Sequence, residues 1–250
     1  MKKLLVCRLF TTTLSISCLG IAIGATIPSH AQTPTPTPTP TPTVIPSVKP
    51  PFRDIIGDTY FEEIKTAAGM GTTPGFIAGF GDDTFRPLLP LTREQLVSMV
   101  LAGISRNISP VSTPTQLTSR PYTDVETSRW SAANIQWAKN NKIVSGYDDG
   151  NFRPEQPITR AELIAVQRRA AEYSLTLRGG TAQITPRQTP VNFTDMNGHW
   201  AASLVSQMSG YCKVASPLNE VGTAFAPNTP SQRNYGVAAT VRMIRCVTQP

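Results

Sequence analysis

Residues 146–163 read GYDDGNFRPEQPITRAEL, a turn-rich segment that runs into the start of a predicted helix. The chain contains this segment a second time, because GFGDDTFRPLLPLTREQL at 79–96 aligns with it without a gap. A weaker third copy, FAPNTPSQRN, lies at 225–234 and keeps the phenylalanine, two prolines and the arginine at the same relative places. Internal repetition of this kind predicts a fold assembled from similar units.

An arginine stands in the first turn of the predicted helix in every copy. The three are Arg93, Arg160 and Arg233. The positive end of the helix dipole disfavours a cation there, so helix formation does not explain the residue. One interpretation is that the guanidinium and the helix N-terminus together bind a carboxylate or phosphate of a ligand. The other is an ion pair with an acidic neighbour, for which the candidates are Asp54, Asp124 and Asp195.

Each copy belongs to a longer repeat that opens with an aromatic-x-Asp phrase. The phrases begin at Phe52, Tyr122 and Phe193, so the starts are 70 and 71 residues apart. A second aromatic residue follows in each repeat, and a first helix is predicted near it. These aromatic residues are Tyr60, Trp130 and Trp200.

A second helix is predicted after the turn, because apolar residues recur there at helical spacing. They are Leu96, Met99, Val100 and Ile104 in the first copy, and Leu163, Val166, Ala170 and Ala171 in the second. Segments rich in Pro, Thr, Ser and Gly separate the repeats and are predicted linkers. We therefore predict an all-α fold of three helix–loop–helix repeats, at 52–108, 122–176 and 193–250.

The N-terminus predicts export. Residues 1–31 combine a positively charged start, an apolar stretch and a small-residue cleavage site before Gln32, which is typical of a secretory signal peptide. An uncleaved membrane anchor and lipidation at Cys18 are the alternatives. Residues 32–51 are rich in alternating Thr and Pro, which predicts an extended spacer.

Cleavage after Ala31 would leave 20 basic and 16 acidic residues, a net charge of +4 instead of +7. It would also leave two cysteines, Cys212 and Cys246. Exported chains meet oxidising conditions, so we predict a disulfide between them, with two buried free thiols as the alternative. Both lie in the third repeat, where most of the turn phrase is missing. Our hypothesis is that the disulfide replaces the stabilisation that this turn supplies elsewhere.

Four motifs at fixed spacing resemble the S-layer homology (SLH) repeat: aromatic-x-Asp, WSAANI, GYDDGNFRP and TRAE. The second copy matches nearly completely, and the first has Tyr60 for the tryptophan and Gln95 for the glutamate. The third copy is degenerate, since Gln232 replaces the threonine and Tyr235 replaces the glutamate.

The resemblance implies three repeats packed as a pseudo-threefold, all-helical unit in a monomer. It also implies that grooves between repeats bind anionic polysaccharide linked to peptidoglycan, so that the protein is a non-covalent anchor in the cell wall or envelope. No cofactor is expected. The alternative is a structural protein whose SLH unit docks another envelope protein.

The candidate ligand-binding residues are Arg93, Arg160, Arg233, Trp130, Trp200, Asp54, Asp124 and Asp195. The tryptophans fit either sugar stacking or the core, and the aspartates fit caps of the first helices. Thr159 with Glu162, and Thr92 with Gln95, have the spacing of a capping box. Trp137 and the phenylalanines of the turn are predicted core residues; the latter are Phe85, Phe152 and Phe225.

The sequence argues against an enzyme. His199 is the one histidine left after cleavage, and it lies inside a repeat motif. The Gly-x-Ser-x-Gly motif and metal-binding clusters of His and Cys are absent from the sequence. Asp148-Asp149-Gly150 lacks the alternating aspartates of a calcium loop and is predicted to be a plain turn. A mild positive charge on an exported protein gives little support to nucleic-acid binding.

Overall fold

The structure is a computed structural model that describes residues 51–71 and 74–249. All of these belong to one of the two units into which the chain divides, Ser47–Pro250. In the described ranges the secondary structure consists of six α-helices, one 3-10 helix and three isolated β-bridges. The all-α prediction is confirmed.

The predictions for the N-terminus concern residues that the structure does not describe. They are the signal peptide at 1–31, lipidation at Cys18 and, apart from Pro51, the spacer at 32–51. Among the described residues, no helix combines the length and apolarity needed to cross a membrane.

Each repeat contributes a short helix followed by a longer one. The short helices are α1 (Phe61–Ala67), α3 (Ala132–Asn140) and α5 (Ala202–Gly210). The long helices are α2 (Arg93–Asn107), α4 (Arg160–Leu177) and α6 (Arg233–Thr248), and the 3-10 helix η1 (Leu218–Glu220) precedes α6. Every long helix begins at the arginine that the three copies share.

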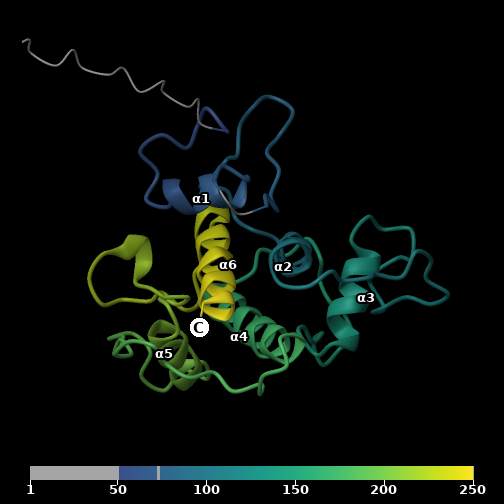
Figure 1. The fold of residues 1–250 in the computed structure, drawn as a ribbon. Helices are drawn as coiled ribbons and strands as arrows, with labels where there is room; N and C mark the ends of the chain where they lie inside the picture. The colour runs from purple at the N-terminus through teal and green to yellow at the C-terminus, as the bar shows by residue number, and fades with distance from the viewer. Residues whose placement is uncertain (1–50, 72–73, 250) are drawn as a thin grey trace, which may run out of the picture. The chain divides into compact units, whose positions relative to one another are not determined.

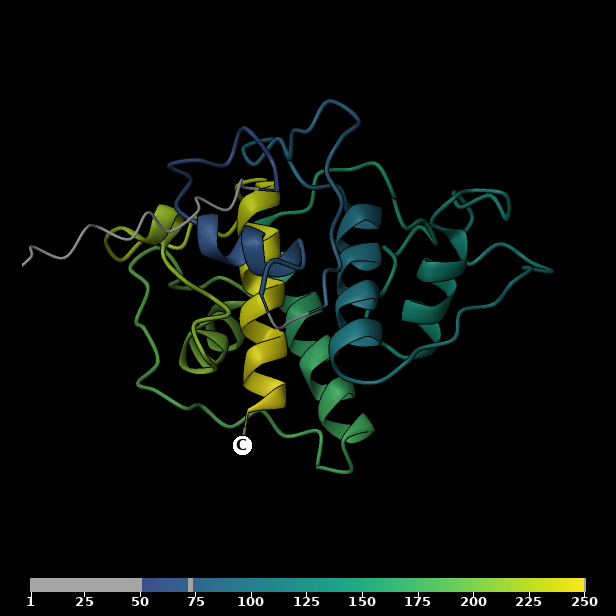
Figure 2. The ribbon, with the colours of Figure 1, turned by 45° about the horizontal axis from the view of Figure 1, so that its top comes forward.

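The short helix of each repeat packs against the long helix of another repeat. Helix α3 contacts α2, α5 contacts α4, and α1 contacts α6, which closes a ring of three repeats. The long helices contact one another at the centre, with the short helices outside them (Figure 1). Figure 2 shows α1 lying against α6, although the two come from opposite ends of the unit. This is the pseudo-threefold packing that the SLH resemblance implied.

A triangle of backbone hydrogen bonds joins the three repeats just before their long helices. The amide of Leu91 donates to the carbonyl of Ser231, that of Ser231 to Ile158, and that of Ile158 back to Leu91, at 2.8, 2.8 and 2.9 Å. All three residues are buried. Since buried backbone groups need partners, the triangle ties the order of the repeats to the satisfaction of the central amides.

The core contains the side chains that the helical spacing predicted. The eight apolar residues predicted for the second helices of repeats 1 and 2 are buried, and so are Phe85, Phe152, Phe225 and Trp137. Ile143 is also buried, although it lies beyond the end of α3.

The predicted disulfide between Cys212 and Cys246 is present, with 5.8 Å between their Cα atoms. It joins the segment after α5 to the last turns of α6. The disulfide therefore fixes the segment after α5 to α6, the long helix of the same repeat.

Candidate functional site

Arg93, Arg160 and Arg233 lie buried where neighbouring repeats meet, with 8%, 2% and 8% of their surface exposed. The Nε atom of each donates a hydrogen bond to a phenylalanine carbonyl of another repeat. The acceptors are, in the same order, Phe152 at 2.8 Å, Phe225 at 2.7 Å and Phe85 at 3.0 Å. Each guanidinium also lies over the ring of that phenylalanine. The arginines therefore join repeat 1 to 2, 2 to 3 and 3 to 1.

The first amides of the long helices are also occupied by the neighbouring repeat. The amide of Arg160 donates to the carbonyl of Thr229 and that of Ala161 to Pro227, both at 3.0 Å, and the equivalent amides of α2 and α6 have equivalent acceptors. An anion at these helix N-termini would need the same N–H groups. Packing between the repeats therefore already uses the N–H groups that the predicted anion site would need.

The other interpretation of these arginines, an ion pair with an acidic neighbour, is confirmed only in part. Within the described part of the chain, one of the three arginines forms an ion pair: Arg93 Nη1 lies 3.5 Å from Glu162 Oε1. The three aspartates proposed as partners instead hold the turns. A direct ligand-binding role for the arginines stays a proposal.

Asp54, Asp124 and Asp195 each accept two backbone hydrogen bonds from the turn of their own repeat. For Asp124 the donors are the amides of Phe152 and Arg153, at 2.7 and 2.6 Å. Arg153 has a φ of 58°, a strained conformation for a non-glycine residue, and its counterparts Arg86 and Ala226 have φ values of 56° and 57°. The prediction that these aspartates cap the short helices is wrong, because those helices lack a side-chain cap hydrogen bond.

The turn hydrogen bonds also affect Asp195. Burial acts to raise the pKa of its carboxyl, but the amides of Phe225 and Ala226 outweigh that effect, and the pKa is lowered. The aspartate therefore stays ionised and fixes the turn that carries the phenylalanine acceptor of Arg160.

Both capping boxes are confirmed. The Thr92 side chain accepts from the Gln95 amide, the Thr159 side chain accepts from the Glu162 amide, and in each pair the N3 side chain accepts a hydrogen bond from the cap residue's amide. At the start of α6 Gln232 forms no cap hydrogen bond. Residues 147–150 form the predicted plain turn, in which the Tyr147 carbonyl accepts the amide of Gly150.

Trp130 and Trp200 stand at the same motif position and are 62% and 65% exposed, so neither is a core residue. In the first repeat Tyr60 holds this place, and it is buried against Tyr235 with ring centroids 5.9 Å apart. Trp200 lines a cavity, together with residues of the first two repeats.

This cavity, the open groove, has a volume of about 270 Å³ and lies between repeats 1 and 2. Its polar and aromatic walls include Arg93, Tyr147, Glu162, Arg169 and Trp200. The Tyr147 hydroxyl donates to Glu162 Oε1 at 3.0 Å, and its ring lies under the Arg93 guanidinium. Two arginines and one glutamate leave an excess positive charge, which favours an anionic ligand.

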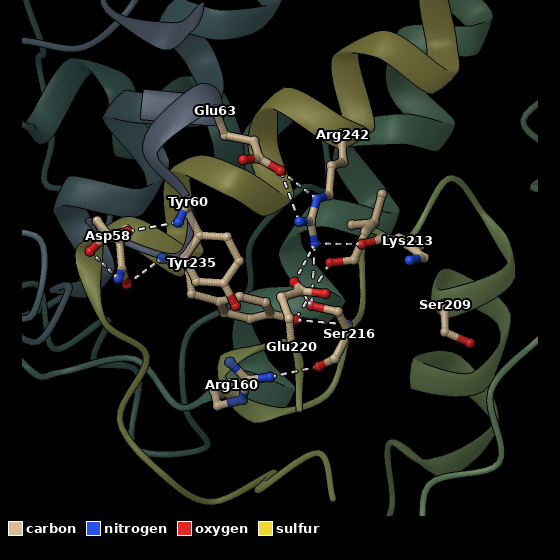
Figure 3. Close-up of polar contacts among 12 residues, drawn as sticks. Asp58, Tyr60, Glu63, Arg160, Ser209, Lys213, Ser216, Glu220, Tyr235 and Arg242 are labelled. Carbon is tan, nitrogen blue, oxygen red and sulfur yellow. Dashed lines mark hydrogen bonds and ion pairs between the residues drawn. The ribbon is translucent and has the colours of Figure 1, made fainter. Parts of the chain in front are cut away.

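At the equivalent place between repeats 2 and 3, side chains from the first and third repeats lie together beside Arg160 (Figure 3). Tyr235 stands where α4 has Glu162; it is buried, and Arg160 lies 3.7 Å from its ring centroid. Arg242 donates to Glu220 and to Glu63, each at 2.8 Å. We call this region the filled groove.

Several of these residues were not predicted from the sequence. Glu63 pairs with Arg242 in the third repeat. Arg169 and Arg242 stand nine residues after Arg160 and Arg233, a spacing that would have revealed them as a pair.

A second missed cluster joins repeats 1 and 2 beside the open groove. Glu94 accepts from Arg129 at 2.7 Å and from the Ser131 hydroxyl at 2.6 Å, and Arg129 also reaches Glu155. Burial acts to raise the pKa of Glu94, but these hydrogen bonds prevail and lower it. The cluster fixes the start of α3 against α2.

Both ring nitrogens of His199 form hydrogen bonds within the third repeat. Its Nδ1 accepts the amide of Ala201 at 3.1 Å, so that Nε2 carries the proton and donates to Asn228 Oδ1 at 3.2 Å. Among the residues that the structure describes, no group of three or more His, Cys, Asp or Glu side chains could hold a metal ion.

The S-layer homology domain matches this chain at residues 51–97 and 121–164. These are the first two repeats, including both capping boxes and the turn motifs. Two of the three repeats are thus S-layer homology repeats. In the third repeat, which the match does not include, Asp195 accepts from the amide of Phe225 and Arg233 donates to the carbonyl of Phe85, as their counterparts do in the first two repeats.

Known relatives share this region. The chain is 27% identical over 156 residues to the "Cellulosome-anchoring protein" of Acetivibrio thermocellus, a match of 61% of this chain and 32% of that protein. It is 29% identical over 105 residues to the "Surface layer protein" of Brevibacillus choshinensis, covering 42% of this chain and 9% of that one. An "Endoglucanase" of a Bacillus species is 32% identical over 97 residues, covering 39% and 9%. The chain thus spans a third or less of these relatives. The SLH repeats assign it to the cell envelope.

Proposed function

We propose that this SLH protein is a non-catalytic anchor that binds an anionic polysaccharide linked to peptidoglycan. The observation that carries this proposal is the open groove, where an exposed indole, Trp200, borders a cavity with excess positive charge. Exposed aromatic faces suit sugar rings and arginines suit their acidic groups. The names of the anchoring and surface-layer relatives support the same role.

The proposed contacts divide the motif residues into two groups. Trp200 and Arg93 line the open groove and would face the ligand. Arg160, Arg233 and the three motif aspartates would act indirectly, by holding the repeats in register. Because α1 packs on α6 within one chain, the proposed anchor would act as a monomer.

The test is co-sedimentation of the purified protein with bacterial sacculi, either intact or stripped of their linked polymer by acid. Trp200→Ala is the diagnostic variant. Trp130→Ala is its matched control, since Trp130 is similarly exposed at the same motif position but does not line the open groove. We expect binding to intact sacculi alone, and about tenfold weaker binding for Trp200→Ala, as expected for loss of an aromatic contact worth about 1–1.5 kcal/mol. Trp130→Ala should bind like the wild type.

Equal binding to stripped sacculi would contradict the polysaccharide and indicate peptidoglycan itself. Absence of binding to both would contradict the anchor. Docking on another envelope protein is the remaining alternative, and three exposed apolar side chains of the first repeat, Ile56, Leu88 and Leu89, favour it. Salt separates these cases, because binding through charges weakens with ionic strength whereas apolar docking does not.

A further inference from the structure

The three long helices are fastened to the outer part of their own repeats near their C-terminal ends, each in a different way. The residue thirteen positions after the first residue of each long helix is Arg106, Tyr173 or Cys246. The Tyr173 ring meets Trp137 edge-on, with ring centroids 5.4 Å apart, and Cys246 forms the disulfide with Cys212. The second and third repeats are therefore closed here by a ring pair and by a covalent bond.

At the same place the first repeat, within the described residues, is closed by polar contacts to backbone carbonyls. Arg106 Nη1 donates to the carbonyl of Gly75. Asn107 Nδ2 donates to the carbonyls of Pro74 and Gly103, at 3.4 and 3.1 Å. The Oδ1 atom of Asn107 is buried and has no hydrogen-bond donor among the described residues. Since buried polar atoms are normally paired, the closure of the first repeat is less complete than that of the other two.

A cavity of about 270 Å³ lies beside these contacts, bordered by α1, α6 and the end of α2. We call it the basal pocket. Its apolar wall consists of three buried side chains, Phe76, Val241 and Ile244. A methylene group is about as large as a water molecule, which takes up roughly 30 Å³ in the liquid. The basal pocket could therefore hold an aliphatic chain of about eight carbons.

The basal pocket also has an excess of positive charge. Arg106 and Arg245 line it and are exposed, and no Asp or Glu is among the described residues that line it. Arg245 Nη2 donates to the Thr66 hydroxyl at 3.2 Å, so both guanidinium groups bond to neutral oxygens and keep further N–H donors. Glu62, one turn before Thr66, pairs with Lys65.

The position of the two arginines has a simpler explanation, which accounts for part of the site. The C-terminal ends of α2 and α6 carry the negative end of the helix dipole and favour a cation there. That effect does not require an apolar cavity beside the cations. The combination of an apolar wall with unneutralised guanidinium groups is what selects a class of ligand.

We propose that the basal pocket binds an anionic amphiphile, with an acyl chain of about eight carbons against the apolar wall and the carboxylate bound by Arg106 and Arg245. Burial of the chain and charge-assisted hydrogen bonds both favour such a ligand. The site is separate from the open groove, because Arg93 and Arg106 stand about 20 Å apart along α2 at 1.5 Å per residue. Acyl chains in an envelope come from membrane lipids, so the proposal adds a lipid-derived ligand to this protein.

The test is an NMR titration that follows the δ1 methyl resonance of Ile244, assigned with Ile244→Val. The probes are sodium octanoate, octyl glucoside below its micelle concentration, and sodium acetate, at matched ionic strength. We expect octanoate to shift the resonance with half-saturation at about 1 mM, a reasonable strength for so small a ligand. Octyl glucoside should bind at least tenfold more weakly, because its head group is neutral. Acetate should have no effect in this range, and Ile143, outside the pocket lining, is the internal reference.

The length of the chain tests the apolar wall. Each methylene removed should raise the half-saturation concentration about fourfold, so that hexanoate binds about fifteenfold more weakly than octanoate. Decanoate should gain less than this factor per carbon, because the basal pocket is filled by about eight carbons. A half-saturation concentration that does not change between hexanoate and octanoate would contradict burial of the chain.

Arg245→Gln tests the recognition of charge. It should weaken octanoate binding about tenfold and leave octyl glucoside binding unchanged, because only the carboxylate loses its partner. Arg178→Gln is the matched control, since it removes the same charge at the C-terminal end of α4, outside the pocket lining. Far-UV circular dichroism checks that both variants stay folded.

Four results would each overturn the proposal: an Ile244 resonance that octanoate does not move, equal binding of octanoate and octyl glucoside, an equal response to acetate, or indifference to Arg245→Gln. The proposal does not depend on the anchor, because Trp200 does not line the basal pocket. Trp200→Ala should therefore leave the octanoate titration unchanged, and Arg245→Gln should leave sacculus binding unchanged. Either function can fail in these experiments without the other.

Discussion

At the centre of the ring the three repeats share the same arginine, phenylalanine and aspartate, whereas the equivalent groove positions hold different residues. The position nine residues along each long helix is Ala102, Arg169 or Arg242, and the position of Glu162 is Gln95 or Tyr235 elsewhere. The shared residues make the contacts between repeats. Repetition within this chain therefore marks the residues that join the repeats, and divergence marks the surfaces where the grooves differ in shape and charge.

The largest effect should come from breaking one of the shared central contacts. Arg160→Ala leaves the buried carbonyls of Phe225 and Ser216 without their donors. We expect a loss of about 4 kcal/mol in the free energy of unfolding, since each unpaired buried acceptor costs about 1–3 kcal/mol. Urea denaturation followed by circular dichroism measures it.

Arg169→Ala is the control for that comparison, because it removes the same side chain from a groove position of the same helix. Its unfolding free energy should stay within about 0.5 kcal/mol of the wild type. If the two variants were equally stable, the division between structural centre and functional groove would be wrong.

The next effect tests whether the third repeat depends on its disulfide. Cys212 and Cys246 are 34 residues apart, and a cross-link of that length contributes about 3–4 kcal/mol by restricting the unfolded chain. The Cys212→Ser, Cys246→Ser double variant should lose that amount, and dithiothreitol should have no effect on it. Wild-type protein with the same urea midpoint in oxidised and reduced form would reject the idea that the disulfide replaces the missing turn chemistry.

A smaller effect is expected at the turn of the second repeat. Asp124→Asn replaces a carboxylate that accepts from two amides by a group with one acceptor and one donor, so one N–H loses its partner. We expect a loss of about 1–2 kcal/mol. The exposed neighbour Asp148→Asn should be neutral in the same urea titration, and a comparable loss there would indicate a general charge effect.

The sequence predicted the features that depend on nearby residues. The capping boxes join positions three residues apart, and the buried stripes of α2 and α4 follow the helical period, so both can be identified in a single repeat. The disulfide followed from the small number of cysteines in an exported chain.

The partners of the arginines could not be predicted in the same way. Arg93 and its acceptor Phe152 are 59 residues apart, and Arg233 and Phe85 are 148 apart. A repeated motif gives the residues but not which copy each one contacts, because that depends on how the ring closes. The same holds for Glu63 and Arg242, at 179 residues.

The smallest effect concerns the acid response of the filled groove. Burial acts to raise the pKa of Glu220, but Ser216 and Arg242 outweigh it and lower the pKa below the ordinary value of 4.5. A carboxylate with a lowered pKa in the folded state contributes stability above its unfolded pKa and loses it as the pH falls through the folded pKa. Wild-type protein should therefore exceed Glu220→Gln in unfolding free energy at pH 7, and the difference should shrink as the pH falls below about 4.5. A difference that stays constant from neutral to acidic pH, measured by urea denaturation, would mean that Glu220 stabilises the fold by its shape and not through its ionised carboxylate.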